Sequence, residues 1–410
     1  MHMGRPSRPL LLVLASTYPR WHDDHEPAFV HELCRRLSGR FRVVVVVPDA
    51  PGADPGGELD GVEVRRFRYA PRRLQTLVND GGIVANLRGS RWKWLLLPGF
   101  VLAQYREAGK VLHQYRVDAI HAHWLLPQGM LAWLLARGRD VPFVVTSHGG
   151  DLYGLRMPAL GWLKRRVAAA STAMSVVSAA MLEEARAQGI RSPRMSVLPM
   201  GVDLVSRFCP DASTSRDDDS LLFVGRLVAK KGIRHLLDAM PKVVAERPSV
   251  HLNIAGFGPE EDALRRQANE LGIAGHVTFL GATRQVDLPS MYRSAALFVA
   301  PFVREASGDQ EGLPVALMEA IGCGCPVLAG KVAGIHELLG AYADDVVVDP
   351  LDTVKLAGRI LEVLSRPEHA RGQAESRRLA LGRKVDWQVV ADGYADWIET
   401  TCLRSRGERS

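Results

Sequence analysis

The stretch that decides the fold is Leu221–Glu246, which reads LLFVGRLVAKKGIRHLLDAMPKVVAE. It begins with a continuous apolar run, Leu221–Val224, of the kind that forms a strand buried on both faces of a parallel sheet. A glycine-containing turn follows, and Gly232–Glu246 is then expected to be helical. This strand–loop–helix unit predicts a doubly wound α/β domain, whose chemistry is to be sought in the loops after the strands.

The same alternation of strand and helix continues on both sides of this stretch. On the C-terminal side the expected strands are Val250–Ala255, Val277–Leu280, Leu297–Ala300, Pro326–Ala329 and Val346–Val348, and the expected helices are Glu260–Leu271 and Pro314–Gly322. On the N-terminal side the expected strands are Leu10–Ala15, Val43–Val47, Val62–Arg66, Ala119–Ala122, Phe143–Thr146, Ala173–Val177 and Met195–Pro199, with a helix at Phe29–Leu37. Each series suits one doubly wound domain.

A polar segment, Leu204–Ser220, separates the two series and ends in the acidic run Asp217–Asp219. We therefore predict an N-terminal Rossmann-like domain over 1–203, a linker over 204–220 and a C-terminal Rossmann-like domain over 221–385. A final helical segment covers 386–410. Because ligands of such sheets bind beyond the carboxyl ends of the strands, we expect the two domains to face an interdomain cleft. The acidic run is interpreted as solvated charge rather than as a metal-binding motif.

The composition is that of a globular protein with sizeable cores. Of the 410 residues, 47% are hydrophobic and 24% are charged, and the net charge is +7. A basic balance suits an anionic substrate, a nucleic acid or an anionic membrane surface, but only the charge supports nucleic acid, which we do not expect as a partner. The five cysteines lack the spacing of a zinc site, which favours a reducing cytoplasm. No apolar run reaches the roughly 18 residues of a spanning helix, and Leu10–Ala15 is predicted to be a buried strand rather than a signal peptide.

A candidate anion site lies at Glu311-Gly312-Leu313-Pro314, directly before the expected helix that contains Glu319. Pro314 suits the first helical position, where an N–H group would have no partner within the helix. The free N–H groups of a helix start and the positive end of its dipole attract anions. At about 1.5 Å per residue, Glu319 would lie about 7.5 Å further along the axis, so the two glutamates could contact two parts of one ligand. The alternative is a capped helix with two solvated glutamates.

Two further loops offer positive charge and glycines. Gly225-Arg226-Leu227 follows the first strand of this domain and Lys231 precedes its first helix, so Arg226 and Lys231 could neutralise a diphosphate. Lys230 is expected to be solvated. Gly256-Phe257-Gly258 resembles the start of a dinucleotide fingerprint, but the third glycine is missing, so it is weak evidence for NAD. Glycines that let a ligand approach the backbone explain this motif equally well.

Histidines lie at the ends of two expected strands in the N-terminal half. His148, in Ser147-His148-Gly149-Gly150-Asp151, could point into the cleft and donate a hydrogen bond to a sugar or to developing charge. The alternative is a structural histidine bonded to backbone. His121-Ala122-His123 places two imidazoles on one face of a strand, as in some metal sites. No third ligand is evident at suitable spacing, so we predict no metal.

The segment Gly61–Lys110 carries ten lysines or arginines against three acidic residues. Within it, Trp92-Lys93-Trp94 interleaves aromatic and basic side chains. Such a patch suits an anionic lipid surface or a lipid-linked acceptor. In the alternative, both tryptophans belong to the core and the arginines are solvated, and the sequence favours neither interpretation.

Taken together, these motifs resemble the family-4 glycosyltransferases of the GT-B fold over nearly the whole chain. The matching stretches in the C-terminal half are Leu198–Asp203, Phe223–Leu227, Lys231-Gly232, Ile254–Pro259, Val277–Gly281, Glu311–Ala320, Gly324–Val327 and Gly334–Glu337. In the N-terminal half, Ser147–Asp151 is similar to the histidine motif of the family. One departure is the loop Ser16–His22, which lacks the glycine pair that the family often carries after its first strand.

The resemblance implies a retaining transferase that binds a nucleotide-diphospho-sugar, a UDP- or GDP-sugar, mainly through its second domain. It implies that Arg226 and Lys231 hold the diphosphate and that Glu319 binds the ribose. Glu311 would bind hydroxyls of the donor sugar, and His148 would lie near this sugar and the acceptor. The other residues assigned to the donor are Gly225, Gly256, Gly258, Gly281, Gly312, Leu313 and Pro314. Those assigned to the acceptor side are Tyr18, His123 and Asp151.

Front-face substitution, the mechanism that the resemblance implies, needs positive charge on the leaving diphosphate but no general base, no metal and no other cofactor. We expect a hydroxyl acceptor that is lipid-linked or part of a polysaccharide or glycoconjugate, and a location in the cytoplasm, at the inner face of the membrane if the basic segment binds lipid. The final helix, with Trp387 and Trp397, is expected to cross back onto the first domain. Three alternatives remain: an NAD-dependent oxidoreductase, a nucleotide-sugar epimerase of related fold, and a non-catalytic GT-B-like binding subunit.

Overall fold

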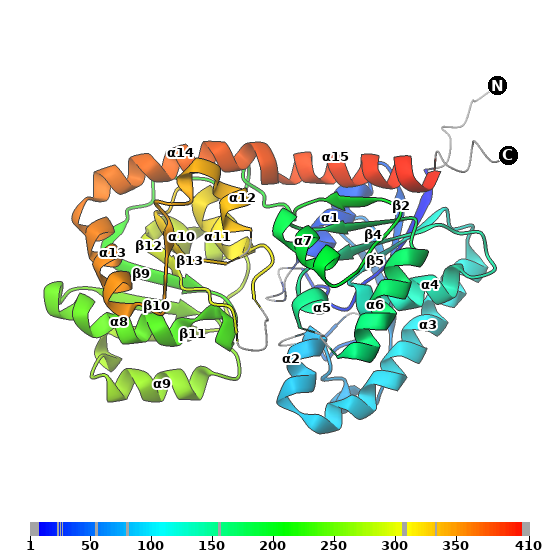
Figure 1. Cartoon of the computed structure of the whole chain (residues 1–410), viewed down its shortest axis with the longest axis horizontal. Coiled ribbons are helices and arrows are strands. Elements are labelled where there is room, and N and C mark those ends of the chain that lie inside the picture. Colours follow the sequence, from blue (N-terminus) through cyan, green and yellow to red (C-terminus); the bar gives the residue numbers. More distant parts are fainter. Residues whose placement is uncertain are drawn as a thin grey trace. The chain divides into compact units, whose positions relative to one another are not determined.

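The computed structural model of the chain describes residues 8–22, 24, 26, 28–53, 56–78, 82–154, 157–305, 310–332 and 334–403. The chain divides into two compact units (Figure 1). The first unit consists of Met1–Pro199 together with Val390–Ser410, and the second is Met200–Val389. Each unit contains one sheet with helices packed against it, and the two are described separately below.

The sheet of the first unit has the order β3-β4-β2-β1-β5-β6-β7-β8. Its strands are β1 (Leu10–Leu14), β2 (Arg42–Pro48), β3 (Gly57–Leu59), β4 (Val62–Phe67), β5 (Ala119–His123), β6 (Phe143–Ser147), β7 (Ala173–Val176) and β8 (Met195–Val197). All neighbouring pairs are parallel except β3 with β4. The central strands β1 and β5 are buried along their whole length, as the continuous apolar run of β1 predicts, although β5 contains two histidines.

The helices of the first unit complete its α/β layers. They are α1 (Phe29–Leu37), α2 (Gly82–Gly89), α3 (Leu96–Gln114), α4 (Met130–Ala136), α5 (Gly150–Tyr153), α6 (Pro158–Ala170), α7 (Ala179–Ala187) and most of α15 (Trp387–Ile398). The amide of Gln104, on α3, donates to the backbone oxygens of Ala15 and Val46 and so ties this helix to the sheet. On α15, the Tyr394 hydroxyl donates to the Leu198 oxygen at 3.0 Å. The last helix therefore packs on the first unit from Val390 onward.

The sheet of the second unit is parallel throughout and has the order β11-β10-β9-β12-β13-β14. Its strands are β9 (Asp217–Val224), β10 (His251–Ala255), β11 (Val277–Gly281), β12 (Ala295–Ala300), β13 (Val327–Gly330) and β14 (Val347–Val348). Its helices are α8 (Ile233–Glu246), α9 (Glu261–Glu270), α10 (Leu288–Ser294), α11 (Val315–Gly322), α12 (Ile335–Leu339), α13 (Thr353–Ser365) and α14 (Pro367–Val385).

Alternate side chains of β9 enter two separate cores, one on each face of this sheet. Leu221 and Phe223 pack with α8, α9 and α13, whereas Leu222 and Val224 pack with α10, α11 and α12. Burial on both faces is what the unbroken run of apolar residues predicts for a central parallel strand. The predicted α/β class and the two Rossmann-like domains are confirmed.

Most predicted elements lie within a few residues of the observed ones, but the boundary between the two series differs. The segment 204–220 was predicted to be a linker, yet Leu204 and Phe208 are buried in a core of the second unit. In addition, β9 already begins at Asp217, so the acidic run forms the exposed start of a strand. The polar composition of the segment hid these two anchoring side chains. Strand β3 and the long helix α3 were not predicted at all.

Gly256 is the position where a side chain is least tolerable. Its φ is +149°, and a Cβ there would lie 1.8 Å from the Gly225 oxygen. We expect Gly256→Ala to lower the free energy of unfolding by about 2–4 kcal/mol, because the two loops cannot both keep their positions. The control is Gly358→Ala on α13, where a Cβ meets nothing within 4 Å; helix propensity makes it neutral or slightly stabilising. Denaturant unfolding of both variants checks the prediction, and equal stability of the two would contradict it.

Candidate active site

The candidate donor site lies at the topological switch point of the second unit. Strand β9 lies between β10 and β12, so the connections of the chain leave it toward opposite edges of the sheet. In doubly wound sheets, ligands bind beyond the carboxyl ends of the strands at this point. The loop after β9 carries Arg226 and Lys231, and the connection after β12 carries Glu311. Residues about 80 positions apart in the sequence are thereby brought to one edge of one sheet.

Two of the predicted donor-binding glycines allow the loops around this point to pack against each other. A Cβ on Gly258 would lie 2.5 Å from the Leu227 oxygen, and one on Gly256 would clash with Gly225. The Leu227 N–H donates to the Phe257 oxygen at 2.9 Å. Close approach of two backbones therefore explains why residues 256 and 258 are glycines, whereas the sequence suggested close approach of a ligand. A contact of these glycines with a donor stays a prediction.

Lys231 and Glu311, assigned to different parts of the donor, form an ion pair in the ligand-free protein. The Lys231 Nζ lies 3.2 Å from Glu311 Oε2, and the Lys230 Nζ lies 3.4 Å from Oε1. Lys231 also lies over the Phe302 ring, 4.9 Å from its centroid. Burial alone would raise the pKa of Glu311, but the two ammonium groups outweigh it and lower the pKa to about 2.

The expectation that Lys230 is solvated is wrong. Its side chain is 21% exposed and contacts Glu311, and its backbone N–H donates to Glu305 Oε1 at 3.1 Å. Gly225 lies against the side chain of the other lysine, Lys231. A Cβ at position 225 would lie 3.5 Å from the Lys231 side chain. The structure thus places two lysines against the Glu311 carboxylate, a pairing that the sequence did not predict.

Helix α11 follows Glu311 and begins at Val315, with Pro314 as its N-cap residue. The helix start is one residue later than predicted. The Leu317 N–H already donates to the Pro314 oxygen at 3.1 Å, so the N–H groups of Val315 and Ala316 are the ones that precede the hydrogen bonds of the helix. Pro314 itself has no N–H group. That this helix start and the loop before it bind an anion stays a prediction.

Glu319 lies deeper in α11, among apolar neighbours. It is 8% exposed, and its Oε2 accepts a hydrogen bond from the Tyr292 hydroxyl at 3.0 Å. Burial raises the pKa of Glu319 to about 7, and the Tyr292 hydrogen bond and the charge of Arg207 offset only part of this rise. Glu319 is therefore not one of the solvated glutamates of the alternative interpretation. Tyr292, which lies 27 residues earlier on α10, carried no signal in the sequence.

A separate group of candidate residues lies in the first unit, beyond β5 and β6. His148 follows β6 and is half-buried, with the rings of Phe29 and Trp124 at 5.0 and 5.1 Å from its own. Its Nε2 lies 2.9 Å from Nδ1 of His123, the last residue of β5. Burial, with a smaller contribution from His121, lowers the pKa of His148 to about 3. The imidazole is therefore neutral at pH 7 and able to donate one hydrogen bond.

The three residues assigned to the acceptor side are all buried. His123 is fully buried, Tyr18 is 4% exposed and Asp151 is 2% exposed. The carboxylate of Asp151 accepts from the Leu125 N–H and the Ser147 hydroxyl. These three side chains therefore support the loops around His148, and direct contact with an acceptor stays a prediction for them.

The glycine-poor loop Ser16–His22 is held by a buried side chain instead of a glycine turn. The Tyr18 hydroxyl lies 2.7 Å from Nδ1 of His31 on α1, and the other ring nitrogen of His31 lies 2.8 Å from Asp60 Oδ2. Neither His31 nor Asp60 was singled out in the sequence, because their partners are distant along the chain.

Among the described residues, no group of three or more His, Cys, Asp or Glu side chains is arranged to hold a metal ion.

Comparison with known proteins agrees with this geometry. Residues 210–379 match the family model described as glycosyl transferases group 1, and residues 27–201 match the glycosyl transferase 4-like domain. The chain belongs to the family-4 glycosyltransferases. As a family-4 glycosyltransferase it is a transferase of nucleotide sugars with the GT-B fold. The oxidoreductase alternative is thereby removed.

Two curated relatives and one solved structure illustrate the range of this glycosyltransferase family. The chain is 28% identical over 400 residues to glycogen synthase from Mycobacterium tuberculosis, covering 93% of this chain and 91% of the relative. It is 27% identical to the GDP-mannose-dependent monoacylated alpha-(1-6)-phosphatidylinositol monomannoside mannosyltransferase of Corynebacterium glutamicum, covering 71% and 78%. HepE from Anabaena, in complex with UDP and glucose, superposes with a TM-score of 0.73 at 17% identity and covers 96% of this chain and all of its own. At that identity the match shows the shared fold.

Proposed function

We propose that this protein transfers a sugar with retention of configuration from a UDP- or GDP-sugar to a hydroxyl acceptor. The observation that carries the proposal is the cluster of Lys231, Lys230 and Glu311 at the switch point of the second unit, directly before the start of α11. Buried cations beside free helix N–H groups suit a diphosphate. A carboxylate between them suits the hydroxyls of the attached sugar. The acceptor is proposed to be lipid-linked or part of a polysaccharide or other glycoconjugate.

Each group has one part of the donor to bind. Lys231 and Arg226 neutralise the diphosphate, together with the N–H groups before α11. Glu311 accepts hydrogen bonds from the donor sugar, and Glu319 accepts from the ribose. His148 donates a hydrogen bond to the sugar as it is transferred. When the donor binds, the Lys231–Glu311 ion pair is replaced by contacts of Lys231 with the diphosphate and of Glu311 with the sugar.

The pKa values support a mechanism without a dedicated general base. An efficient base has a pKa near the working pH. Glu311, with a pKa of about 2, and His148, with a pKa of about 3, are both far weaker bases. Glu319, with a pKa of about 7, is hydrogen-bonded to Tyr292 and is assigned to the ribose rather than to the transferred sugar. In front-face substitution the sugar–phosphate bond loosens first, the acceptor hydroxyl attacks from the side of the leaving group, and a phosphate oxygen takes the proton. The protein contributes charge and position rather than proton transfer.

The experiment that tests the proposal is a donor panel. The purified protein is incubated with UDP-glucose, GDP-mannose and ADP-glucose, and both hydrolysis and the shift of its melting temperature are measured. We expect a response to a UDP- or GDP-sugar, with the released or transferred sugar retaining its anomeric configuration. Chelation with EDTA is expected to leave the turnover unchanged, because buried cations neutralise the leaving group. No response to any nucleotide sugar, or an inverted product, would overturn the proposal.

Donor binding is expected to weaken below pH 7. A ribose-binding Glu319 must be ionised, and its pKa in the free protein is raised to about 7. Below this value a proton must leave on binding, so affinity falls by up to about tenfold per pH unit, and above it affinity is constant. Isothermal titration between pH 5.5 and 8.5 measures this, using a nucleotide sugar whose diphosphate does not titrate in that range. Glu319→Gln is expected to bind more weakly and to lose the pH dependence; a variant that keeps it would refute the assignment.

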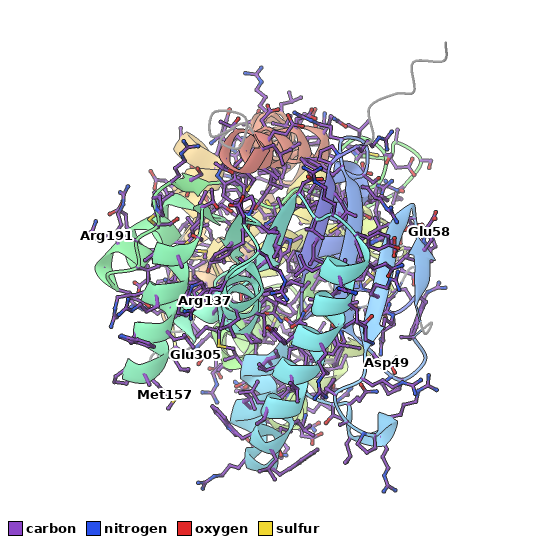
Figure 2. The ribbon with its side chains drawn as sticks, turned by 90° about the vertical axis from the view of Figure 1, so that its right-hand side faces the viewer. Asp49, Glu58, Arg137, Met157, Arg191 and Glu305 are labelled. Carbon is purple, nitrogen blue, oxygen red and sulfur yellow. The ribbon has the colours of Figure 1, made fainter. Side chains whose placement is uncertain are left out.

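A membrane surface is proposed as a further partner. Three side chains of the short helical turn Arg91–Leu95 are exposed: Trp92 by 45%, Trp94 by 44% and Leu95 by 81%. The interpretation of the two tryptophans as core residues is therefore wrong. Exposed aromatic and basic side chains side by side suit the interface of an anionic bilayer. Part of the basic charge of the segment is used internally, because Arg68 pairs with Asp49, a buried residue after β2. Asp49 is labelled in Figure 2. None of the described helices is long and apolar enough to cross a membrane.

Vesicle sedimentation tests this partner. We expect the protein to bind vesicles that contain phosphatidylserine and to be released as salt is raised, because each basic residue near the surface contributes about 1 kcal/mol. Trp92→Ala with Trp94→Ala is expected to abolish binding. The control is Trp162→Ala on α6, a tryptophan that is 53% exposed elsewhere on the same unit. An equal loss of binding in the Trp162→Ala control would contradict a specific membrane-binding surface at Trp92 and Trp94. No binding by the unaltered protein would also contradict the proposed location of the protein at the inner face of the cytoplasmic membrane.

A further inference from the structure

A layer of three histidines lies inside the first unit, and the proposed reaction uses only one of them directly. His121 and His123 alternate along β5 and are both fully buried, and His148 follows the neighbouring strand β6. Nδ1 of His123 and Nε2 of His148 are 2.9 Å apart, with the two ring planes within 15° of each other. A direct imidazole–imidazole hydrogen bond of this length carries one proton, donated by one ring and accepted by the other.

The surroundings of His123 decide which ring donates. Its other nitrogen, Nε2, is buried and meets no hydrogen-bond partner among the described residues. If the single proton of the neutral ring were on Nε2, a buried N–H would have no acceptor. Unpaired buried N–H groups are rarer and more costly than an unpaired acceptor lone pair. The proton of His123 therefore lies on Nδ1 and is donated to His148. Burial, and then the two neighbouring histidines, lower the pKa of His123, so the ring does not take a second proton.

We infer that His123 is a positioning residue that fixes His148 in the tautomer with its proton on Nδ1. Once Nε2 of His148 accepts a hydrogen bond, the proton of the neutral His148 ring must be on its other nitrogen. His148 then offers a donor, not an acceptor, at its free side. The rings of Phe29 and Trp124, at 5.0 and 5.1 Å, restrict rotation of the imidazole and keep Nε2 turned toward His123.

His121 contributes to the same layer in a different way. Its Nε2 lies 2.8 Å from the Thr146 hydroxyl, which lies 2.8 Å from the Ser175 hydroxyl. The His121 ring is 4.3 Å from that of His123 and 5.9 Å from that of Tyr394 on α15. His121 therefore packs against His123 without bonding to His148. This makes it a matched control: an equally buried histidine, two residues away on the same face of the same strand.

The consequence for chemistry rests on the proposed function. A donor at the free side of His148 can bond to a hydroxyl oxygen of the sugar or to an oxygen that gains negative charge as the sugar–phosphate bond loosens, whereas the other tautomer would present a lone pair there. Partners that fix the tautomer of a functional histidine are commonly worth about 10–100-fold in activity. We expect His123→Leu to lower turnover by about this factor with little change in the affinity for the donor nucleotide. His123→Asn, whose carboxamide N–H can take the place of Nδ1–H, is expected to restore most of the activity.

The test reads the tautomer directly, in the full-length protein with ¹⁵N-labelled histidine. The ring nitrogens of His148 are assigned by the signals that disappear in His148→Gln, and their ¹⁵N shifts show which nitrogen carries the proton. We expect Nδ1–H in the unaltered protein, in His123→Asn and in His121→Gln, and a mixture or the Nε2–H form in His123→Leu. An Nε2–H form or a mixture in the unaltered protein, or an unchanged tautomer in His123→Leu, would overturn the inference.

The two readouts separate this inference from the proposed function. The NMR measurement needs no substrate, so it decides the tautomer even if the protein turns over no nucleotide sugar in the donor panel. Should His123→Leu fold poorly, the unaltered protein and His123→Asn still give the decisive spectra. A turnover loss in His121→Gln as large as in His123→Leu would show that packing, and not the hydrogen bond to His148, is what matters, and would overturn the positioning role.

Discussion

Replacing Lys231 with alanine is expected to lower the turnover of the best nucleotide-sugar donor by about 10²–10³-fold, the usual cost of removing one preorganised group from a developing charge. Lys231 is a buried cation at the switch point. Its side chain is 14% exposed, and its ammonium group lies 3.2 Å from Glu311 and over the ring of Phe302. A buried charge of this kind acts on the leaving diphosphate with little screening by water. Steady-state kinetics and the dissociation constant of the nucleoside diphosphate should both reveal the loss.

The matched control for Lys231→Ala is Lys242→Ala, since Lys242 lies on the exposed side of α8, the helix that follows Lys231. It removes the same charge from the same unit and is expected to leave kcat unchanged. Removing Lys231 leaves Glu311 with Lys230 as its remaining cation, so the melting temperature of the variant should be measured alongside its activity. Turnover of Lys231→Ala at the rate of the unaltered protein would show that the diphosphate binds elsewhere.

The sequence allowed most elements of the fold to be predicted because both sheets are parallel, apart from the antiparallel pair of β3 with β4. Buried parallel strands such as Leu221–Val224 are unbroken apolar runs, and the helices between them cover both faces of each sheet. Segment 204–216 could not be predicted in the same way. There the chain is polar apart from isolated side chains such as Leu204 and Phe208, and nothing local shows that these two insert into a core.

The candidate site was predicted in part for a similar reason. Residues in the loops after strands, such as Lys231, Glu311 and His148, could be found because strand ends are recognisable in the sequence. Their partners could not, because a partner depends on which elements meet in space. Tyr292 reaches Glu319 from another helix, and His123 bonds to His148 only because β5 and β6 are neighbours. The sequence singled out His123 but not its bond to His148, and its assignment to the acceptor side stays a prediction.

Glu311→Ala is expected to lower turnover as strongly as Lys231→Ala, by about 10²–10³-fold, but to act on binding in the opposite direction. In the free protein the Glu311 carboxylate neutralises Lys231 and Lys230, as its pKa of about 2 indicates. Removing it leaves two cations without their counter-charge at the position proposed for the diphosphate. The affinity for the free nucleoside diphosphate should therefore be unchanged or higher, while the affinity gained from the sugar is lost.

An unchanged or higher affinity for the diphosphate, together with a lower affinity for the intact donor, distinguishes a carboxylate that binds the sugar from one that has only a structural role. If Glu311 only held the two lysines in place, its removal would weaken the binding of nucleoside diphosphate and nucleotide sugar together, as the loss of Lys231 should. Glu311→Gln keeps the shape and removes the charge, so it should show the same pattern with a smaller loss of turnover. Glu246→Ala, at the exposed end of α8, is the control for a lost carboxylate. Calorimetric titration of each variant with the diphosphate and with the intact donor measures both affinities. Parallel weakening of the two in Glu311→Ala would contradict the contact between Glu311 and the donor sugar, while leaving the diphosphate site at Lys231 in place.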